Sequence, residues 1–152
     1  MLLVIRDEDD ACPRETAPLG ARWLLEQDLP FPSALVLLHR EYETLFLPCV
    51  AQMAGRPLVD ERGISRTGLM ESVTFNGDPE SVRGAKEWLS GRFPPGRSYK
   101  PTLDQLPMTR MIDFKVLRQA KLPSFVHLER ALRFLAHPPA SVQVYPPPSE
   151  MA

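Results

Sequence analysis

The stretch Met1-Leu-Leu-Val-Ile-Arg-Asp-Glu-Asp-Asp10 decides the fold, because an aliphatic run passes directly into a series of carboxylates. Continuous aliphatic sequence from Leu2 to Ile5 is typical of a strand covered on both faces, as in a parallel sheet. Asp7 and Asp9, two residues apart, would then emerge at the carboxyl end of that strand, where α/β proteins form a crevice. Their oxygen atoms suit Mg²⁺ or Mn²⁺. The alternative interpretation is a polar loop that follows a strand.

A second aliphatic run, Ala34-Leu-Val-Leu-Leu38, completes a β-α-β pattern. Residues 14–27, between the two runs, place Leu19 and Trp23 on one side of a helix, as in an amphipathic helix. A right-handed crossover makes the two strands parallel, so both carboxyl ends lie at one edge of the sheet. The sequence therefore predicts an α/β protein with a small parallel sheet flanked by helices.

Further carboxylates, Glu41 and Glu43, follow the second strand. Neighbouring strands lie ~4.8 Å apart, so either side chain can approach Asp7 and Asp9. Glu41 is therefore a candidate third carboxylate, an acid or base for phosphodiester hydrolysis beside a metal held by the two aspartates. The structural alternative for Glu41 is a place at a helix N-terminus, where the helix dipole favours its charge by about 0.3–1 kcal/mol.

The C-terminal half of the chain is predicted to be mainly helical. Asp78 before Pro79 is typical of an N-cap followed by the first helical residue. We expect Cys49 and Trp88 to face the core, as we do Trp23. Residues 56–78 lack periodicity and predict a loop, with a short helix around residues 69–73. The predicted helices cover residues 42–54, 79–92, 102–106, 108–120 and 124–136.

Length and composition fit one globular domain. The 152 residues, 43% of them hydrophobic, can bury a substantial core. Many of the 17 prolines fall late in the chain, where they favour extended backbone. We therefore expect a single domain over residues 1–137 and a Pro-rich, extended or mobile tail over residues 138–152.

Charge and composition exclude several classes of protein. A net charge of -1 gives no overall positive field, so any contact with nucleic acid or anionic lipid must be local. Cys12 and Cys49 lack metal-type spacing and are expected to be reduced thiols. No stretch approaches the roughly 20 apolar residues of a membrane span, and no signal peptide is recognisable. The sequence predicts a cytoplasmic protein without membrane contact.

Five motifs occur in an order that resembles a bacterial protein family. They are Leu3-Val-Ile-Arg-Asp-Glu-Asp-Asp10, Arg40-Glu-Tyr-Glu-Thr-Leu-Phe-Leu47, Ala85-Lys-Glu-Trp-Leu89, Tyr99-Lys-Pro-Thr-Leu-Asp-Gln105 and Pro123-Ser-Phe125. This series, from about residue 2 to about residue 136, is similar to the domain of unknown function 4276 (DUF4276) family. That family is described as Toprim-like.

The resemblance implies a Toprim-like fold, in which a carboxylate cluster binds Mg²⁺ for phosphodiester chemistry on DNA or RNA. Some relatives resemble components of phage-defence systems that act with an AAA-type ATPase, which implies such a partner here. Asp7 and Asp9 match the metal ligands of the family pattern, and Asp10 would assist them. Glu41 and Glu43 match its Glu-Tyr-Glu element. The implied activity is that of a magnesium-dependent nuclease or a related phosphotransfer component.

The sequence departs from the Toprim pattern at one position. Toprim proteins carry a glutamate on a strand upstream of the Asp-x-Asp strand, whereas here no residue precedes Met1. We expect either that the chain starts late or that it represents a shortened branch. The alternative function is then a non-catalytic interaction module, with an exposed sheet edge that invites pairing with another chain or a homo-oligomer.

Basic and polar residues of the later motifs are candidates for contact with phosphate. Lys86 and Arg40 could bind phosphate as a point charge and as a fork, respectively, or they could pair with nearby acids. Lys100 and Arg110 are further candidates, whose alternative is a solvated helix surface. The same crevice could include Tyr99, Asp104 and Gln105, whose alternative role is helix capping and packing around Pro101.

Overall fold

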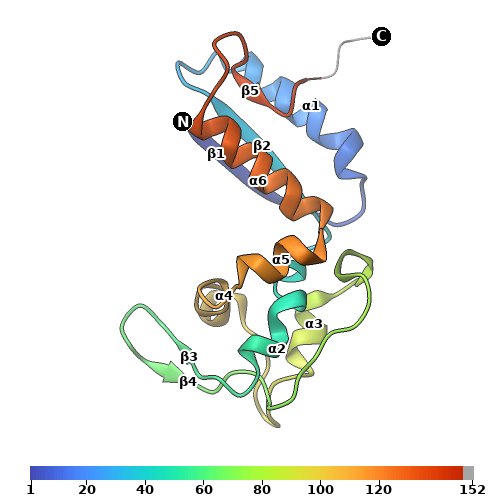
Figure 1. Cartoon of the computed structure of the whole chain (residues 1–152), viewed down its shortest axis with the longest axis vertical. Coiled ribbons are helices and arrows are strands. Elements are labelled where there is room, and N and C mark those ends of the chain that lie inside the picture. Colours follow the sequence, from blue (N-terminus) through green and yellow to red (C-terminus); the bar gives the residue numbers. More distant parts are fainter. Residues whose placement is uncertain (149–152) are drawn as a thin grey trace. The chain divides into compact units, whose positions relative to one another are not determined.

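The computed structural model describes residues 1–148 (Figure 1). They form two compact units: residues 1–42 together with the segment from Pro123 onward, and residues 43–122. The sequence predicted one domain over residues 1–137. It stays a prediction. The segment between the second strand and the last helix buries a set of apolar side chains of its own, among them Phe46, Leu58, Leu89 and Met108.

The first unit is a parallel sheet with helices. Strands β1 (Leu2–Glu8), β2 (Ser33–His39) and β5 (Val144–Tyr145) pair in the order β1-β2-β5. Both pairings are parallel, and β1 matches β2 residue for residue from Leu2 opposite Ser33 to Glu8 opposite His39. Helix α1 (Pro13–Glu26) connects β1 to β2, and helix α6 (Pro123–Ala136) follows the second unit. The predicted parallel β-α-β unit is confirmed.

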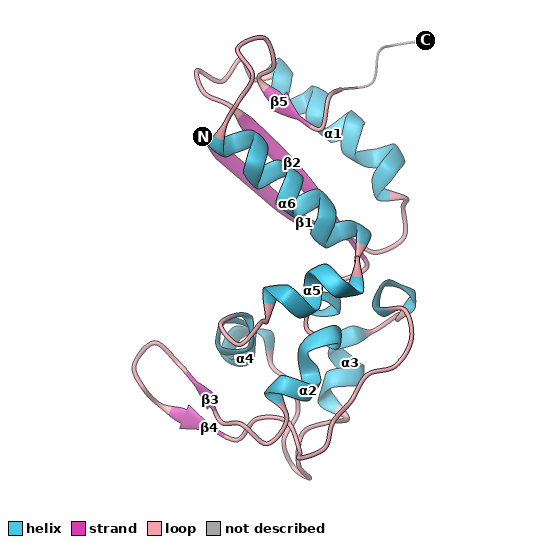
Figure 2. Ribbon diagram, in the orientation of Figure 1, coloured by secondary structure: helices cyan, strands magenta, loops and turns pink. Residues whose placement is uncertain are grey.

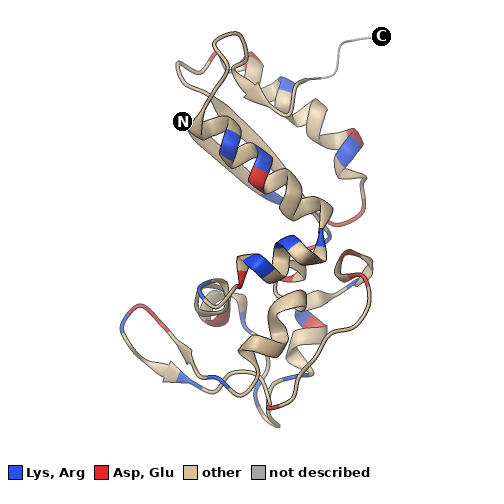
Figure 3. Ribbon diagram, viewed as in Figure 1, with Lys and Arg blue, Asp and Glu red and all other residues tan. Residues whose placement is uncertain are grey.

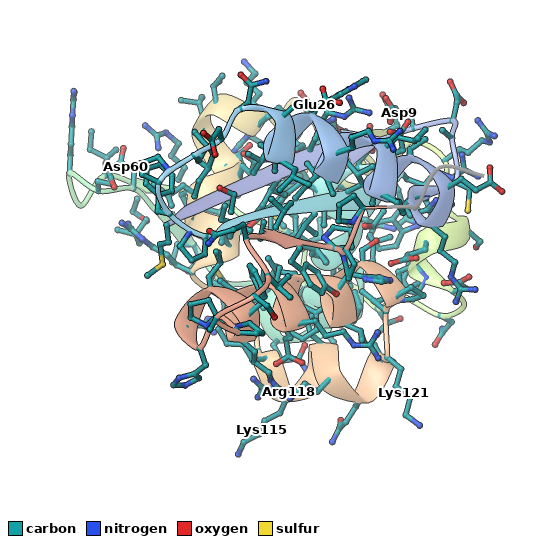
Figure 4. All side chains as sticks on the ribbon, turned by 90° about the horizontal axis from the view of Figure 1, so that it is seen from above. Asp9, Glu26, Asp60, Lys115, Arg118 and Lys121 are labelled. Carbon is teal, nitrogen blue, oxygen red and sulfur yellow. The ribbon has the colours of Figure 1, made fainter. Side chains whose placement is uncertain are left out.

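The two helices cover opposite faces of the sheet, as Figures 1 and 4 show. Helix α1 comes so close to β2 that a Cβ added at Gly20 would lie 2.3 Å from Leu35 Cδ2. Strand β2 is the central strand, and Ala34, Val36 and Leu38 are almost completely buried. Strand β1 has one neighbour within the described residues, and its Ile5 is 42% exposed. The sheet therefore has an open edge along β1.

The second unit contains short elements, mostly helical (Figure 2). A hairpin of two-residue strands interrupts them after the first three helices. The elements are the 3₁₀ helices η1 (Tyr42–Leu45), η2 (Leu47–Cys49) and η3 (Pro79–Ser81), the helices α2 (Val50–Met53), α3 (Ala85–Ser90), α4 (Pro101–Thr109) and α5 (Phe114–Ala120), and the strands β3 (Leu58–Val59) and β4 (Ser65–Arg66). The chain is thus a mixed α/β protein whose helices lie mainly in its C-terminal half.

Prolines and glycines divide two of the predicted helices. The helix expected over residues 42–54 forms as η1, η2 and α2, with Pro48 inside η2. The helix expected over residues 79–92 is interrupted by Gly84, whose positive φ of 74° is left-handed, so only η3 and α3 form. The Asp78 N-cap is confirmed, since its Oδ1 accepts the N–H of Glu80 at 3.0 Å. Residues 69–73 contain no helix.

One further expectation, the burial of Trp23, differs from the structure. Trp23 was expected in the core but is 65% exposed on α1, because α1 packs mainly against β2 and β5 and leaves Trp23 and Leu19 at an open cavity beside β1. Part of the predicted tail, Val144–Tyr145, is a strand paired with Ser33 and Ala34 of β2. Residues 149–152 of that tail lie outside the described residues. Cys49 is fully buried, as predicted.

No helix within residues 1–148 is both long enough and apolar enough to cross a bilayer.

Candidate functional site

The carboxyl ends of β1 and β2 lie side by side and bring two polar segments together. Asp7 is opposite Leu38 and Glu8 is opposite His39 in the parallel register. Residues Asp9 and Asp10 leave β1 at the same edge at which Arg40 and Glu41 leave β2. We refer to residues 7–10 and 40–41 as the acidic edge.

Asp7 links the two halves of the acidic edge. Its Oδ1 accepts the backbone N–H of Tyr42 at 2.9 Å, so the side chain turns from β1 toward the segment that follows β2. The contact satisfies a backbone donor at the start of η1, in the manner of an N-cap. Asp7 is therefore held in place by the fold, which is what a pre-positioned ligand requires.

Arg40 ties the loop after β1 to the end of β2. Its Nη1 donates to the backbone carbonyl of Asp9 at 2.5 Å, and its own N–H donates to the carbonyl of Glu8 at 2.9 Å. Arg40 has a left-handed φ of 72°, unusual for a residue with a side chain. Its Nε is buried without a hydrogen-bond partner among residues 1–148. Arg40 thus fixes the backbone that presents Asp9, whose side chain is exposed.

A closed metal site is not preformed at the acidic edge. Within residues 1–148, no three histidine, cysteine, aspartate or glutamate side chains converge into a group that could hold an ion. Mg²⁺ commonly uses only one or two carboxylates and completes its shell with water and substrate phosphate. Asp7 and Asp9 fit a site of that open kind. The three-carboxylate arrangement that includes Glu41 stays a prediction, as does the assisting role of Asp10.

Glu43 lies in a different setting, at the centre of a buried cluster in the second unit. Its side chain is completely buried. Oε1 accepts the hydroxyl of Tyr99 at 2.8 Å and Nε2 of Gln105 at 3.3 Å. The ring of Tyr99 also packs edge-on to Phe46, with 6.5 Å between the ring centroids. Glu43 therefore connects η1 to α4 and to the segment before it.

Lys86 supplies a positive charge to the same cluster. Its Nζ lies 3.6 Å from Oε2 of Glu43, while 35% of its side chain remains exposed. Oε2 has no hydrogen-bond partner within the described part of the chain. A buried carboxylate that contacts a cation and two neutral donors forms a structural network that links its elements. The structure thus brings together Glu43, Lys86, Tyr99 and Gln105, which come from three of the sequence motifs.

Asp104 has a structural role at the start of α4. It is completely buried, and its carboxylate accepts Nη1 and Nη2 of Arg97 at 3.0 and 2.6 Å and the backbone N–H of Lys100 at 2.7 Å. The predicted alternative, capping around Pro101, is the one that the structure favours. Sequence analysis did not identify Arg97. Its position in a loop after Gly96 gives no periodic signal.

Arg110 and Trp88 lie outside these two groups, and Glu8 belongs to the acidic edge. Arg110 pairs with Glu61 at 3.2 Å, and both side chains are largely exposed, so the pair contributes little to stability. Glu8 forms an ion pair with Arg6 of the same strand. Trp88 packs edge-on to Phe75, with 5.4 Å between centroids. These contacts stabilise local structure and offer no reactive group.

Comparisons of the chain with protein-family models, with curated proteins and with solved structures find no match.

Proposed function

We propose that the chain is a Toprim-like protein that binds Mg²⁺ or Mn²⁺ at the acidic edge and takes part in phosphodiester chemistry on DNA or RNA. The observation that carries the proposal is the parallel register of β1 and β2. It brings Asp7, Asp9 and the Arg40–Glu41 segment to one edge of the sheet. Ligands of α/β proteins bind outside the carboxyl ends of the strands, which is where these residues lie.

Each residue of the acidic edge has a proposed role. Asp7 and Asp9 bind the cation, and Arg40 holds the backbone of Asp9 through its 2.5 Å contact. Asp10 and Glu41 are further carboxylates of the acidic edge. A bound Mg²⁺ would polarise a phosphate and lower the pKa of a water molecule. We propose no phosphate contact for Glu43 or Lys86, because the two side chains contact each other in a buried cluster.

The open edge of β1 offers a way to complete the site. Within the described residues β1 pairs with β2 alone, so another strand could add beside Asp7. Such a strand, supplied by a partner, would carry its own side chains to the acidic edge. An AAA-type ATPase, which the family resemblance implies, is the partner that we propose for the complete assembly.

Helix α5 provides a local positive surface that fits a nucleic-acid partner. Leu117 is buried, while Lys115, Arg118 and Lys121 are exposed. Figure 4 shows these three side chains extending away from the ribbon on one side, and Figure 3 shows positively charged segments on α5. The net charge of -1 gives no attraction over the whole molecule, so a patch of this kind is needed to contact phosphates.

Calorimetric titration with MnCl₂ tests the proposal. The informative variants are Asp7→Asn and Asp9→Asn, because asparagine keeps an oxygen that can accept the Tyr42 N–H but removes the charge. Glu26→Gln removes one carboxylate from the end of α1 and is the matched control. We expect each aspartate variant to abolish Mn²⁺ binding and the control to retain it. The proposal fails if the wild-type chain binds no divalent ion at millimolar concentration.

A nuclease assay extends the same comparison to function. The chain, with and without an added ATPase partner, is incubated with labelled single-stranded and duplex substrates in Mn²⁺. Cleavage that disappears in Asp9→Asn and persists in Glu26→Gln supports a catalytic role. Cleavage that survives both aspartate substitutions would show that it comes from a contaminant or another site.

The second candidate is a non-catalytic interaction module that pairs through β1. The backbone N–H of Leu2 donates to the carbonyl of Pro32, on the β2 side of the strand. Because successive N–H groups point to alternate sides, those of Leu3 and Ile5 point toward the open edge. Beside this edge, an apolar cavity of about 430 Å³ lies between β1 and α1, lined in part by Leu19 and Trp23. A second copy of the chain is the occupant that we propose, because antiparallel β1 pairing would bury the same apolar surface of both copies.

A proline scan separates edge pairing from folding. Ile5→Pro removes an N–H that faces the open edge and leaves the β1–β2 hydrogen bonds, whereas Val4→Pro removes one of those bonds. Light scattering should give a dimer for the wild-type chain and a folded monomer for Ile5→Pro. A wild-type monomer at all concentrations would contradict the interaction module.

A further inference from the structure

A second cavity in the first unit lies between α1, α6 and the edge of β2 that β5 leaves uncovered. Its volume is about 390 Å³, which is the size of a small-ligand pocket. Its polar lining residues are Arg14, His127, Arg130 and Tyr145, and its apolar lining includes Leu37 and Pro146. Because it lies along the middle of β2, it is distinct from the acidic edge and uses none of its aspartates. We refer to it as the β2-edge cavity.

Two arginines from opposite faces of the sheet line the β2-edge cavity. Arg14 lies in the first turn of α1, and Arg130 lies on α6. Neither forms an ion pair with a carboxylate within residues 1–148, unlike Arg97, whose guanidinium binds Asp104. Guanidinium groups without a carboxylate partner among these residues are suited to bind an anionic oxygen group bidentately.

Tyr145 adds a hydroxyl to the cavity, and its ring is held in place. The ring stacks at a tilt on Phe134, with 5.9 Å between centroids, and the hydroxyl lies 3.4 Å from Nδ1 of His127. Burial raises the pKa of Tyr145, and the nearby positive charge of Arg130 opposes that shift. The neutral hydroxyl and the histidine ring can therefore both share hydrogen bonds with a bound oxygen.

The edge of β2 contributes a backbone donor. The N–H of Arg40 donates to the carbonyl of Glu8 in β1. Because successive N–H groups along a strand point to alternate sides, those of Ser33, Leu37 and His39 point away from β1. Ser33 donates to Gln143 and His39 donates to Oγ of Ser124, each at 2.9 Å. Strand β5 pairs with β2 only at Ser33 and Ala34. The N–H of Leu37 thus faces the cavity.

We propose that the β2-edge cavity binds a small organic phosphate monoester. The two guanidinium groups receive the phosphate, because each offers paired N–H donors that match phosphate oxygens. The Tyr145 hydroxyl and the Leu37 N–H supply directional hydrogen bonds, and the apolar lining receives the organic part. This site is additional to metal binding at the acidic edge and does not depend on it.

Chemical-shift titration of the ¹⁵N-labelled full chain tests the site. The probes are phenyl phosphate, inorganic phosphate and benzoate, each added at constant ionic strength without divalent metal. We expect phenyl phosphate to shift the amide signals of Leu37 and Tyr145 and to bind more tightly than benzoate. Equal binding of benzoate would overturn the phosphate assignment, and unchanged Leu37 and Tyr145 signals at millimolar probe would overturn the site. Weaker binding of inorganic phosphate would indicate that the apolar lining contributes.

Matched arginine variants separate specific binding from general attraction. Arg14→Gln and Arg130→Gln remove lining charges, whereas Arg22→Gln and Arg133→Gln remove charges from the same two helices outside the lining. Loss of a charge-assisted contact should weaken binding about tenfold for each lining variant, with little change for the controls. Equal weakening in all four variants would contradict the proposal. Asp9→Asn should bind phenyl phosphate as the wild type does, which distinguishes this site from the acidic edge.

Discussion

Replacing Glu43 with alanine should strongly destabilise the second unit. The carboxylate is completely buried and accepts the Tyr99 hydroxyl at 2.8 Å and the Gln105 amide at 3.3 Å, with Lys86 Nζ at 3.6 Å. Removal would take an acceptor away from the Tyr99 hydroxyl and from the Gln105 amide, and would take the Glu43 carboxylate away from Lys86. Removing one member of a buried pair costs about 3–5 kcal/mol, and we expect a loss in this range. Tyr99→Phe removes one donor and should cost about 1–2 kcal/mol.

Urea unfolding measured by tryptophan fluorescence isolates this effect. Trp88 belongs to the second unit and Trp23 to the first, so a Trp23→Phe background leaves one reporter in the unit of interest. Trp23 is 65% exposed, and its replacement should be mild. A loss below about 1 kcal/mol for Glu43→Ala would refute the structural role.

A double-mutant cycle then separates structure from catalysis. Glu43→Gln and Lys86→Met should be less than additive when combined, because each variant removes the same contact. Additive effects would show that the 3.6 Å approach carries no energy. Variants that fold with wild-type stability but lose nuclease activity would instead support the catalytic roles that the sequence motifs imply.

Three further predictions concern cysteine chemistry and helix packing. Cys12 is exposed and Cys49 is buried, so a thiol reagent should label Cys12 alone in the native chain, and labelling of both would contradict the packing. Burial raises the pKa of Cys49 above its ordinary 9.0, so the folded chain favours the neutral thiol. The free energy of unfolding should therefore decline as the pH rises above that value. A Cys49→Ala variant should lack this decline. Gly20→Ala should destabilise the first unit by about 1–3 kcal/mol, because the new Cβ would lie 2.3 Å from Leu35 Cδ2. Trp23 fluorescence in a Trp88→Phe background would measure this loss, and a gain in stability from helix propensity would refute the close approach.

The sheet and its acidic edge followed from sequence because their signals are local. The aliphatic runs of β1 and β2 and the helix between them specify a parallel pair without knowledge of distant contacts. The Asp78 N-cap and the burial of Cys49 were likewise predictable from neighbouring residues. In each case a few adjacent side chains determine the outcome.

Features that depend on distant partners were not predictable. The role of Glu43 is decided by Tyr99 and Gln105, more than fifty residues away, and spacing alone could not distinguish it from Glu41. Trp23 follows helical periodicity but is exposed, since periodicity indicates a face of the helix and not the extent of the sheet beneath it. Strand β5 was missed because two paired residues within a Pro-rich segment give no strand pattern.

Paramagnetic broadening by Mn²⁺ tests the central claim, which is a divalent-metal site at the carboxyl ends of β1 and β2. Substoichiometric Mn²⁺ should selectively broaden the backbone amide signals of residues 7–10 and 40–42 in the ¹⁵N-labelled chain, because only nuclei near the ion relax rapidly. Asp7→Asn and Asp9→Asn should each abolish this broadening, and Glu26→Gln should leave it intact. Uniform broadening over the chain, or selective broadening elsewhere that persists in both aspartate variants, would contradict a metal site at the acidic edge.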